Sequence, residues 1–209
     1  MEEIIEFFVV VVLISASGVM APGPLFASCI SHGLNGGAKA GLKMACGHTI
    51  VEFPLVVLIG LGAFSLELVP HFREIIALLG AISLFVFAGL QVRSVLKKPI
   101  TVFEGKHGPF LAGIILSALN PFFLVWWFTI GFKLISDSLL IVSFWGIVIM
   151  FLYHIWMDYA WLGFIGFISN KGRKILSNKN YKILIIGLSG VLVYFGITFV
   201  LEAKNLATV

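Results

Sequence analysis

Two histidine–carboxylate pairs are the residues of this chain whose types and spacing could do chemistry. His48 precedes Glu52 by four residues, and His154 precedes Asp158 by four. Residues i and i+4 share one face of a helix, so each pair would present an imidazole and a carboxylate one turn apart. Because an imidazole titrates near neutral pH, it can hold and pass a proton together with a neighbouring carboxylate. We therefore interpret these four residues as a proton relay.

Two other interpretations of the same four residues stay open. Two imidazoles and two carboxylates could form a four-ligand metal site, although many helices carry this spacing without binding a metal. Alternatively, each side chain could be a hydrogen-bonded interior group that ties neighbouring helices together. The repetition of the pair favours the relay, and we expect neither a resident metal nor a cofactor.

The composition indicates where these polar residues must lie. Of the 209 residues, 60% are hydrophobic and only 11% are charged, and the mean hydropathy is +1.09. A soluble domain has roughly 45–50% apolar and about 25% charged residues, so disorder, a coiled coil and an ordinary cytosolic enzyme are excluded. The net charge of +4 does not indicate nucleic-acid binding, because long apolar runs separate the basic residues. The chain is predicted to be an integral protein of the lipid bilayer.

Six apolar stretches lie between clusters of charged residues, and each is about long enough to cross a bilayer as a helix. Their connections are short, so we expect one all-α, polytopic membrane domain over residues 1–209. The first stretch is interrupted at Pro22-Gly23-Pro24, and the fourth is interrupted at Asn120-Pro121. The stretches are residues 4–30, 40–66, 75–92, 110–132, 139–168 and 183–201.

The two pairs are offset by 106 residues, and each lies in the middle stretch of a half that has three stretches. Because three is an odd number, the second half must enter the membrane from the opposite side. This predicts an inverted repeat with halves 1–93 and 110–209, a basic loop at 94–109, and a proline-broken first helix in each half. A break frees backbone groups that lipid cannot satisfy, and the new helix N-terminus would attract a carboxylate. The alternative is a proline kink that binds nothing.

The lysines and arginines predict the orientation in the membrane. Eleven of the fourteen fall in the first, third and fifth connections, whereas most acidic residues lie on the other side. The basic side is expected to be cytoplasmic, which places both termini outside the cell membrane. We interpret the basic stretch 171–182 as a topology signal that contacts lipid headgroups.

The cysteines and the aromatic residues give weaker indications. Cys29 and Cys46 would have to meet if the chain were a membrane thiol–disulfide carrier, but they form no C-x-x-C motif, and we expect both to be buried and inert. The aromatic side chains around Trp126-Trp127 could line a cavity. With 14% aromatic residues, however, most of them must face lipid, the interior or the membrane interface.

Several short motifs follow one another in a recognisable order. A P-G-P motif at 22–24 precedes a glycine-rich turn at 33–37, and Gly47 stands five residues before an acid, Glu52, in the next stretch. The segment at 117–121 reads S-A-L-N-P. This order resembles the LysE/RhtB family of amino-acid exporters, whose second half carries an L-N-P motif. The resemblance covers nearly the whole chain and implies an exporter of amino acids or related small metabolites that is driven by an ion gradient.

These observations combine into one hypothesis, a secondary-active antiporter with an amino acid as substrate and H⁺ as coupling ion. The substrate carboxylate would dock near the two proline breaks, and its ammonium group would meet Glu52 or Asp158. The same carboxylates would bind protons, so that proton and substrate compete for one site. No nucleophile elbow, P-loop or dinucleotide motif is present in the sequence, so we expect no enzyme and no catalytic residue. A divalent-cation exporter and a thiol–disulfide carrier are the alternatives, and a homodimer is left open.

Overall fold

The computed structural model describes residues 2–21, 23–66, 72–97, 107–171 and 178–206, and every regular element in these ranges is a helix. Pro22, residues 98–106 of the predicted basic loop and residues 172–177 of the basic stretch lie outside the described residues. The elements are α1 (Glu2–Val19), α2 (Pro24–Leu66), α3 (Phe72–Lys97), α4 (Pro109–Ala118), α5 (Pro121–Trp126), the π-helical turn η1 (Trp127–Gly131), α6 (Phe132–Val142), α7 (Phe144–Lys171) and α8 (Asn178–Leu206).

Several of these helices are long and apolar enough to cross a bilayer. Among the described residues, four stretches meet this criterion of length and hydropathy: Pro24–Ala63, Phe122–Val142, Phe144–Lys171 and Ile185–Asn205. Shorter apolar helices cover Ile4–Val19, Ala77–Arg93 and Pro109–Ala118. The prediction of an all-α, polytopic membrane protein is therefore confirmed.

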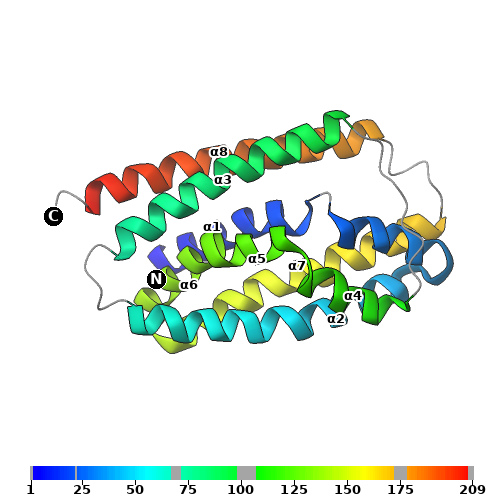
Figure 1. Ribbon diagram of the computed structural model, residues 1–209, viewed down its shortest axis with the longest axis horizontal. Helices are drawn as coiled ribbons and strands as arrows, with labels where there is room; N and C mark the ends of the chain where they lie inside the picture. The colour runs from blue at the N-terminus through cyan, green and yellow to red at the C-terminus, as the bar shows by residue number, and fades with distance from the viewer. Residues whose placement is uncertain (1, 22, 67–71, 98–106, 172–177, 207–209) are drawn as a thin grey trace.

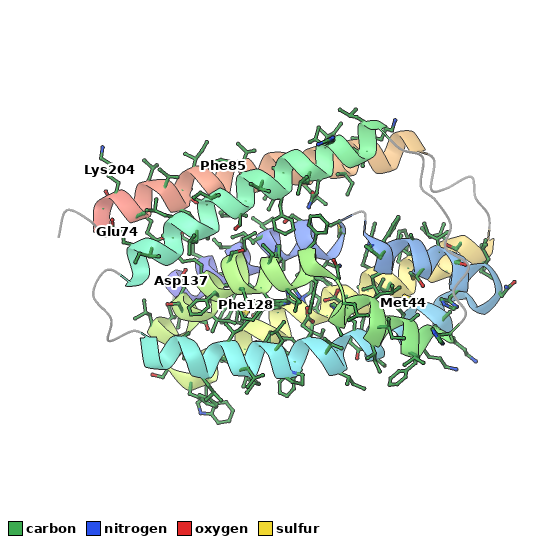
Figure 2. The ribbon with its side chains drawn as sticks, in the orientation of Figure 1. Met44, Glu74, Phe85, Phe128, Asp137 and Lys204 are labelled. Atoms are coloured by element: carbon green, nitrogen blue, oxygen red, sulfur yellow. The ribbon has the colours of Figure 1, made fainter. Side chains whose placement is uncertain are left out.

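The helices form an elongated bundle in which α3 and α8 lie side by side along one face (Figure 1). The most extensive packing joins α2 to α7, and α4 also packs on α2. α1 contacts both α7 and α8, while α6 contacts α2, α3 and α7. α1 begins and α8 ends at the same end of the bundle. Glu74, Asp137 and Lys204 lie toward that end, whereas Met44 lies in the other half (Figure 2).

Two tight turns reverse the chain between long helical segments. Within α2 the backbone of Gly37 has φ 56° and ψ −149°, and Figure 1 shows the chain turning back there. Ser143, between α6 and α7, has nearly the same conformation, with φ 52° and ψ −148°. A positive φ is readily accessible to glycine but uncommon for other residues. α2 therefore consists of two helical segments, residues 24–36 and 38–66, that meet at Gly37.

The fourth helical stretch ends later than the sequence indicates. The sequence predicts a connection at Lys133 and a new helix from Leu139, but this prediction is wrong, because α6 continues to Val142. Lys133 is buried, and its Nζ lies 2.6 Å from Asp137 Oδ2 and 2.8 Å from Glu202 Oε1. These carboxylates compensate the ammonium charge, so the charge is accommodated within the helix. α3 also ends later than predicted, because it extends to Lys97, which lies within the predicted basic loop.

Glycines bring α2 close to α4 and to α7. A Cβ atom added at Gly47 would overlap a carbonyl oxygen of α4, and one added at Gly113 would overlap a carbonyl oxygen of α2. A Cβ atom added at Gly41 would overlap a carbonyl oxygen of α7. Small residues allow this kind of backbone contact between membrane helices. The contacts set the distance at which the side chains of α2 face both neighbours.

We predict that Gly47→Ala and Gly113→Ala each destabilise the protein, because the added methyl group forces α2 and α4 apart. Overpacking of this kind costs about 1–3 kcal/mol, so the melting temperature of the purified protein in detergent should fall. Gly89→Ala is the matched control, since a Cβ atom there would meet nothing within 4 Å. If Gly113→Ala melted at the same temperature as Gly89→Ala, the close contact between α2 and α4 would be refuted.

Candidate functional site

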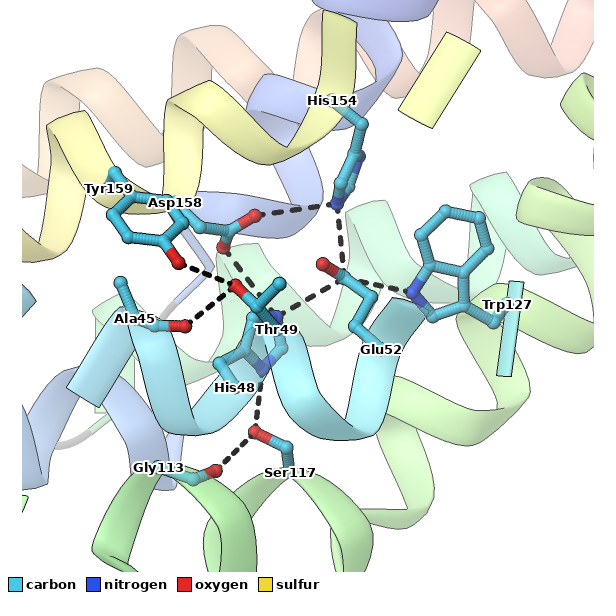
Figure 3. A network of polar contacts seen from close by, with 10 residues as sticks. All are labelled: Ala45, His48, Thr49, Glu52, Gly113, Ser117, Trp127, His154, Asp158 and Tyr159. Carbon is cyan, nitrogen blue, oxygen red and sulfur yellow. Dashed lines mark hydrogen bonds and ion pairs between the residues drawn. The ribbon is translucent and has the colours of Figure 1, made fainter. Parts of the chain in front are cut away.

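The two histidine–carboxylate pairs meet in one buried group, which we call the histidine–carboxylate cluster (Figure 3). His48 and Glu52 come from α2, whereas His154 and Asp158 come from α7. None of the four residues has more than 5% of its surface exposed. Besides the predicted contacts within each helix, the four residues therefore make contacts between the two helices.

Each imidazole of the cluster lies near both carboxylates. His48 Nε2 is 3.2 Å from Glu52 Oε1 and 3.7 Å from Asp158 Oδ1. His154 Nε2 is 3.1 Å from Glu52 Oε1 and 3.5 Å from Asp158 Oδ2. The i to i+4 spacing places each pair on one helical face, and the close packing of α2 on α7 brings the two faces together. Groups that lie far apart in the chain therefore form one network.

Two further side chains, Trp127 and Ser117, complete this network, and neither of these contacts with the cluster was predicted from the sequence. Trp127 Nε1 donates a hydrogen bond of 3.1 Å to Glu52 Oε1. Ser117 Oγ lies 2.6 Å from His48 Nδ1 and donates its own hydrogen to the carbonyl oxygen of Gly113, also at 2.6 Å. Because a hydroxyl group has a single hydrogen, His48 must carry a proton on Nδ1 and donate it to Ser117.

This hydrogen-bonding pattern determines what the cluster can bind. With His48 protonated on Nδ1, its Nε2 faces carboxylate oxygens, so an attractive contact there requires one more proton, on the imidazole or on a carboxyl group. In the described part of the chain, Glu52 Oε2, Asp158 Oδ2 and His154 Nδ1 are buried without a hydrogen-bond partner. Two ionised carboxylates beside neutral imidazoles would leave two uncompensated charges in an apolar medium, which is costly. The cluster is therefore suited to take up protons or a cation.

The helix break before α5 lies next to the cluster. Asn120 caps α5, because its Oδ1 accepts a hydrogen bond of 3.1 Å from the backbone N–H of Phe122. Pro121 follows at the first helical position, where the absence of an N–H group has no cost. Two residues further, the ring of Phe123 packs edge-on against His48 with 5.1 Å between ring centroids. The predicted break at Asn120-Pro121 thus forms part of the wall around His48.

The break between α1 and α2 is held by a side chain from α3. The backbone N–H of Ala21 donates to the carbonyl oxygen of Gly18 at 3.1 Å, and not to that of Ser17 as it would in a continuing helix. Gln91, which is buried, donates to the Ser17 carbonyl oxygen at 2.9 Å instead. Gln91 therefore satisfies a backbone acceptor that the end of α1 leaves without a partner.

The site residues predicted at this first break are less connected. Pro22 lies outside the described residues, and Gly23 and Pro24 stand at the start of α2. A Cβ atom at Gly23 would meet nothing within 4 Å, so the space beside this residue is open. Among the contacts found between described residues, none joins Gly23 or Pro24 to the histidine–carboxylate cluster. Of the described residues at the two breaks, those at the second break thus lie next to the cluster.

The two cysteines are in different surroundings. Both are free; Cys29 is buried and its thiol donates to the Leu162 carbonyl oxygen at 3.2 Å. Cys46 is exposed and accepts a hydrogen bond of 3.7 Å from the hydroxyl group of Tyr159. The expectation that both cysteines are buried is wrong for Cys46, because its side chain stays exposed at the edge of the contact with Tyr159 of α7. Nothing in these contacts favours a thiol–disulfide carrier.

The fold and the site together define a class of protein. Membrane-crossing helices that are interrupted beside a buried cluster of titratable side chains are typical of secondary transporters. The chain belongs to the LysE type translocator family, which matches residues 16–203. No curated protein and no solved structure matches the chain. The resemblance seen in the sequence motifs is thereby confirmed, and the chain is a multi-pass membrane translocator.

We predict that Ser117→Ala impairs transport, because it removes the acceptor of the His48 Nδ1 proton and leaves a buried donor unpaired. Such a loss costs about 1–3 kcal/mol and should alter the pH dependence of uptake into proteoliposomes. Ser169→Ala is the matched control, since Ser169 is also buried on a helix and donates to the carbonyl oxygen four residues earlier, at 2.7 Å. Identical pH profiles for the two variants would show that Ser117 has no role in the site.

Proposed function

We propose that the protein exports amino acids or related small metabolites in exchange for protons. The observation that carries this proposal is the convergence of two carboxylates and two imidazoles in one buried cluster. One cluster can hold protons or a cationic group of the substrate, but repulsion disfavours holding both. Competition between two ligands for one site is the minimum that antiport requires, because each ligand then lowers the affinity for the other.

The unpartnered atoms suggest how the substrate binds. Glu52 Oε2 and Asp158 Oδ2 accept no hydrogen bond in the described part of the chain, although His154 Nε2 lies 3.5 Å from Asp158 Oδ2. Both oxygens would accept from the ammonium group of an amino acid or bind a proton. The substrate carboxylate would dock at the helix breaks, beside Asn120-Pro121 and in the open space at Gly23, where the start of a helix favours negative charge. Because the cluster is buried, the surrounding helices must separate before either ligand can enter.

We further propose that the chain contains six membrane-crossing segments arranged as an inverted repeat of three. Gly37 and Ser143, the two turns with matching backbone angles, are 106 residues apart, which is also the offset between His48 and His154. The packing of α2 on α7 and of α3 on α8 would make neighbours of the corresponding segments in the two halves. Alternating access would then exchange the conformations of the halves around the cluster.

The helix breaks do not follow this offset. Asn120 follows Gly23 by fewer than 106 residues, so the breaks would not be equivalent under the repeat. The C-terminal end of α1 and the N-terminal end of α5 both lie nearer the end of the bundle at which Gly37 turns (Figure 1). This asymmetry favours entry of the substrate from that end.

The same end of the bundle would face the cytoplasm. The exposed residues Lys39, Lys43, Arg93 and Lys171 lie close to the Gly37 turn or to the ends of α3 and α7, and an excess of basic residues marks the cytoplasmic side. In a variant without Cys29 and Cys46, a membrane-impermeant thiol reagent added to intact cells should label a cysteine placed at Glu2 and spare one at Lys171. Labelling of both from outside would refute the orientation.

We predict that Glu52→Gln and Asp158→Asn each abolish substrate export driven by a pH gradient, because an amide cannot take up and release the coupling proton. Counterflow exchange, which needs no net proton movement, should partly persist. Both activities are measured with the purified variants in proteoliposomes. Glu6→Gln is the matched control, since Glu6 is an exposed acid in α1. If both amide variants retained full pH-dependent uptake, the carboxyl groups would serve only as hydrogen-bonding groups between helices.

A divalent-cation exporter is the second candidate, and one observation favours it. His48, Glu52 and Asp158 each offer a ligand atom, and these three atoms lie within 4.8 Å of one another. Carboxylate and imidazole ligands suit several divalent metals. A screen of radiolabelled amino acids and metal ions in proteoliposomes with an imposed pH gradient separates the two functions. Saturable transport of a metal ion with no amino-acid transport would replace the first proposal with the second.

A further inference from the structure

Trp127 is a buried donor that contacts the cluster directly. Only 1% of its surface is exposed, and its Nε1 lies 3.1 Å from Glu52 Oε1. Its ring also packs edge-on against the imidazole of His154, with 5.0 Å between ring centroids. An indole N–H can donate but never accept a hydrogen bond, so it stabilises a carboxylate oxygen without itself competing for the proton.

The backbone around Trp127 is built to place its ring. Trp127 begins η1, a π-helical turn of five residues that ends at Gly131. Such turns are rare overall, but many of those that occur lie at functional sites. A Cβ atom at Gly131 would overlap the indole of Trp127, so the ring occupies space that only a glycine leaves free. The wide turn and the glycine together direct the indole toward Glu52.

The two oxygens of Glu52 have different surroundings as a result. Oε1 accepts from Trp127 and lies 3.1–3.2 Å from both imidazoles, whereas Oε2 is buried without a hydrogen-bond partner in the described part of the chain. Rotation of the carboxylate by less than a half-turn would break the contacts of Oε1. The indole donor opposes this rotation, so that one oxygen of Glu52 stays in contact with the imidazoles and the other stays without a partner.

We propose that Trp127 is a positioning residue that fixes Glu52 in the orientation in which Oε2 receives the proton or the cationic group of the substrate. This inference rests on the proposed function, in which Glu52 carries the coupling proton. It assigns a role in transport to a residue and a π-helical turn that the family motifs in this sequence do not include.

The neighbouring tryptophan provides a matched control. Trp126 is also buried, at 6% exposure, and its ring contacts that of Trp127 at 5.1 Å between centroids. Its indole nitrogen, however, has no hydrogen-bond partner in the described part of the chain. Trp126→Phe and Trp127→Phe therefore remove the same atoms from adjacent buried sites, but only Trp127→Phe removes a donor from Glu52.

The test measures protonation of Glu52 directly and needs no substrate. Infrared absorption of protein with ¹³C-labelled glutamate, reconstituted in lipid, reports the protonated carboxyl as pH is varied, and Glu52→Gln identifies the band. Trp127→Phe should move the midpoint of this titration to higher pH by about one unit, a tenfold change in proton affinity, because a carboxylate that loses a donor binds its proton more tightly. Trp126→Phe should leave the midpoint unchanged.

A second variant covers the case in which Trp127→Phe does not fold. Gly131→Ala keeps the indole but should displace it from Glu52, moving the midpoint in the same direction, whereas Gly62→Ala should not, because a Cβ atom there would meet nothing within 4 Å. Wild-type midpoints in both Trp127→Phe and Gly131→Ala would overturn the proposal even if transport were proton-coupled. A shifted midpoint in a protein that shows no proton-coupled transport would support the role of Trp127 and refute the proposed function alone.

Discussion

Glu52 and Asp158 lie inside a bundle whose surroundings offer little water, and this constraint shapes the rest of the structure. An isolated carboxylate there would cost several kcal/mol, so each acid must be compensated by other side chains or by a ligand. His48 and His154 lie within 3.1–3.7 Å of the acids, but four groups from two helices can meet only if the backbones approach closely. The glycines of α2, the tight turn at Gly37, the donor Trp127 and the acceptor Ser117 can all be understood as meeting this requirement.

The same constraint links the cluster to helix movement. Because the network joins α2 to α7, a change in its proton content alters the attraction between the two most extensively packed helices. The break at Asn120 lies in the wall of the cluster, and the end of α1 is tied to α3 by Gln91. In the proposed antiport, a gain or loss of protons would therefore bias the positions of helices that are interrupted and hence able to bend. Near the start of α6, the buried Lys133 and the partly exposed Asp137 and Glu202 tie α6 to α8, which places a second ionic contact away from the cluster.

The sequence predicted those features that depend on local spacing. Hydropathy predicted the helices and their place in a membrane. The i to i+4 spacing predicted the contact within each histidine–carboxylate pair, and the offset of 106 residues led us to expect that the two pairs are related. The sequence alone could not predict contacts between residues that are far apart in the chain. Lys133 interrupts an apolar run, and one of the two carboxylates that compensate its charge is Glu202, 69 residues later. Trp127 is one of many aromatic residues, and nothing local distinguishes it from Trp126. Ser143 adopts a positive φ that its residue type does not indicate.

We propose that substrate and protons compete for the cluster, and this competition is tested most directly by counting the protons released during substrate binding. The substrate found by the transport screen would be titrated into purified protein by calorimetry, in two buffers with different heats of ionisation. We predict that substrate binding near neutral pH releases protons to the buffer, and that the release is reduced when Glu52 and Asp158 are replaced by amides. Substrate binding without proton release anywhere between about pH 5 and 8, the range in which an imidazole normally titrates, would contradict it.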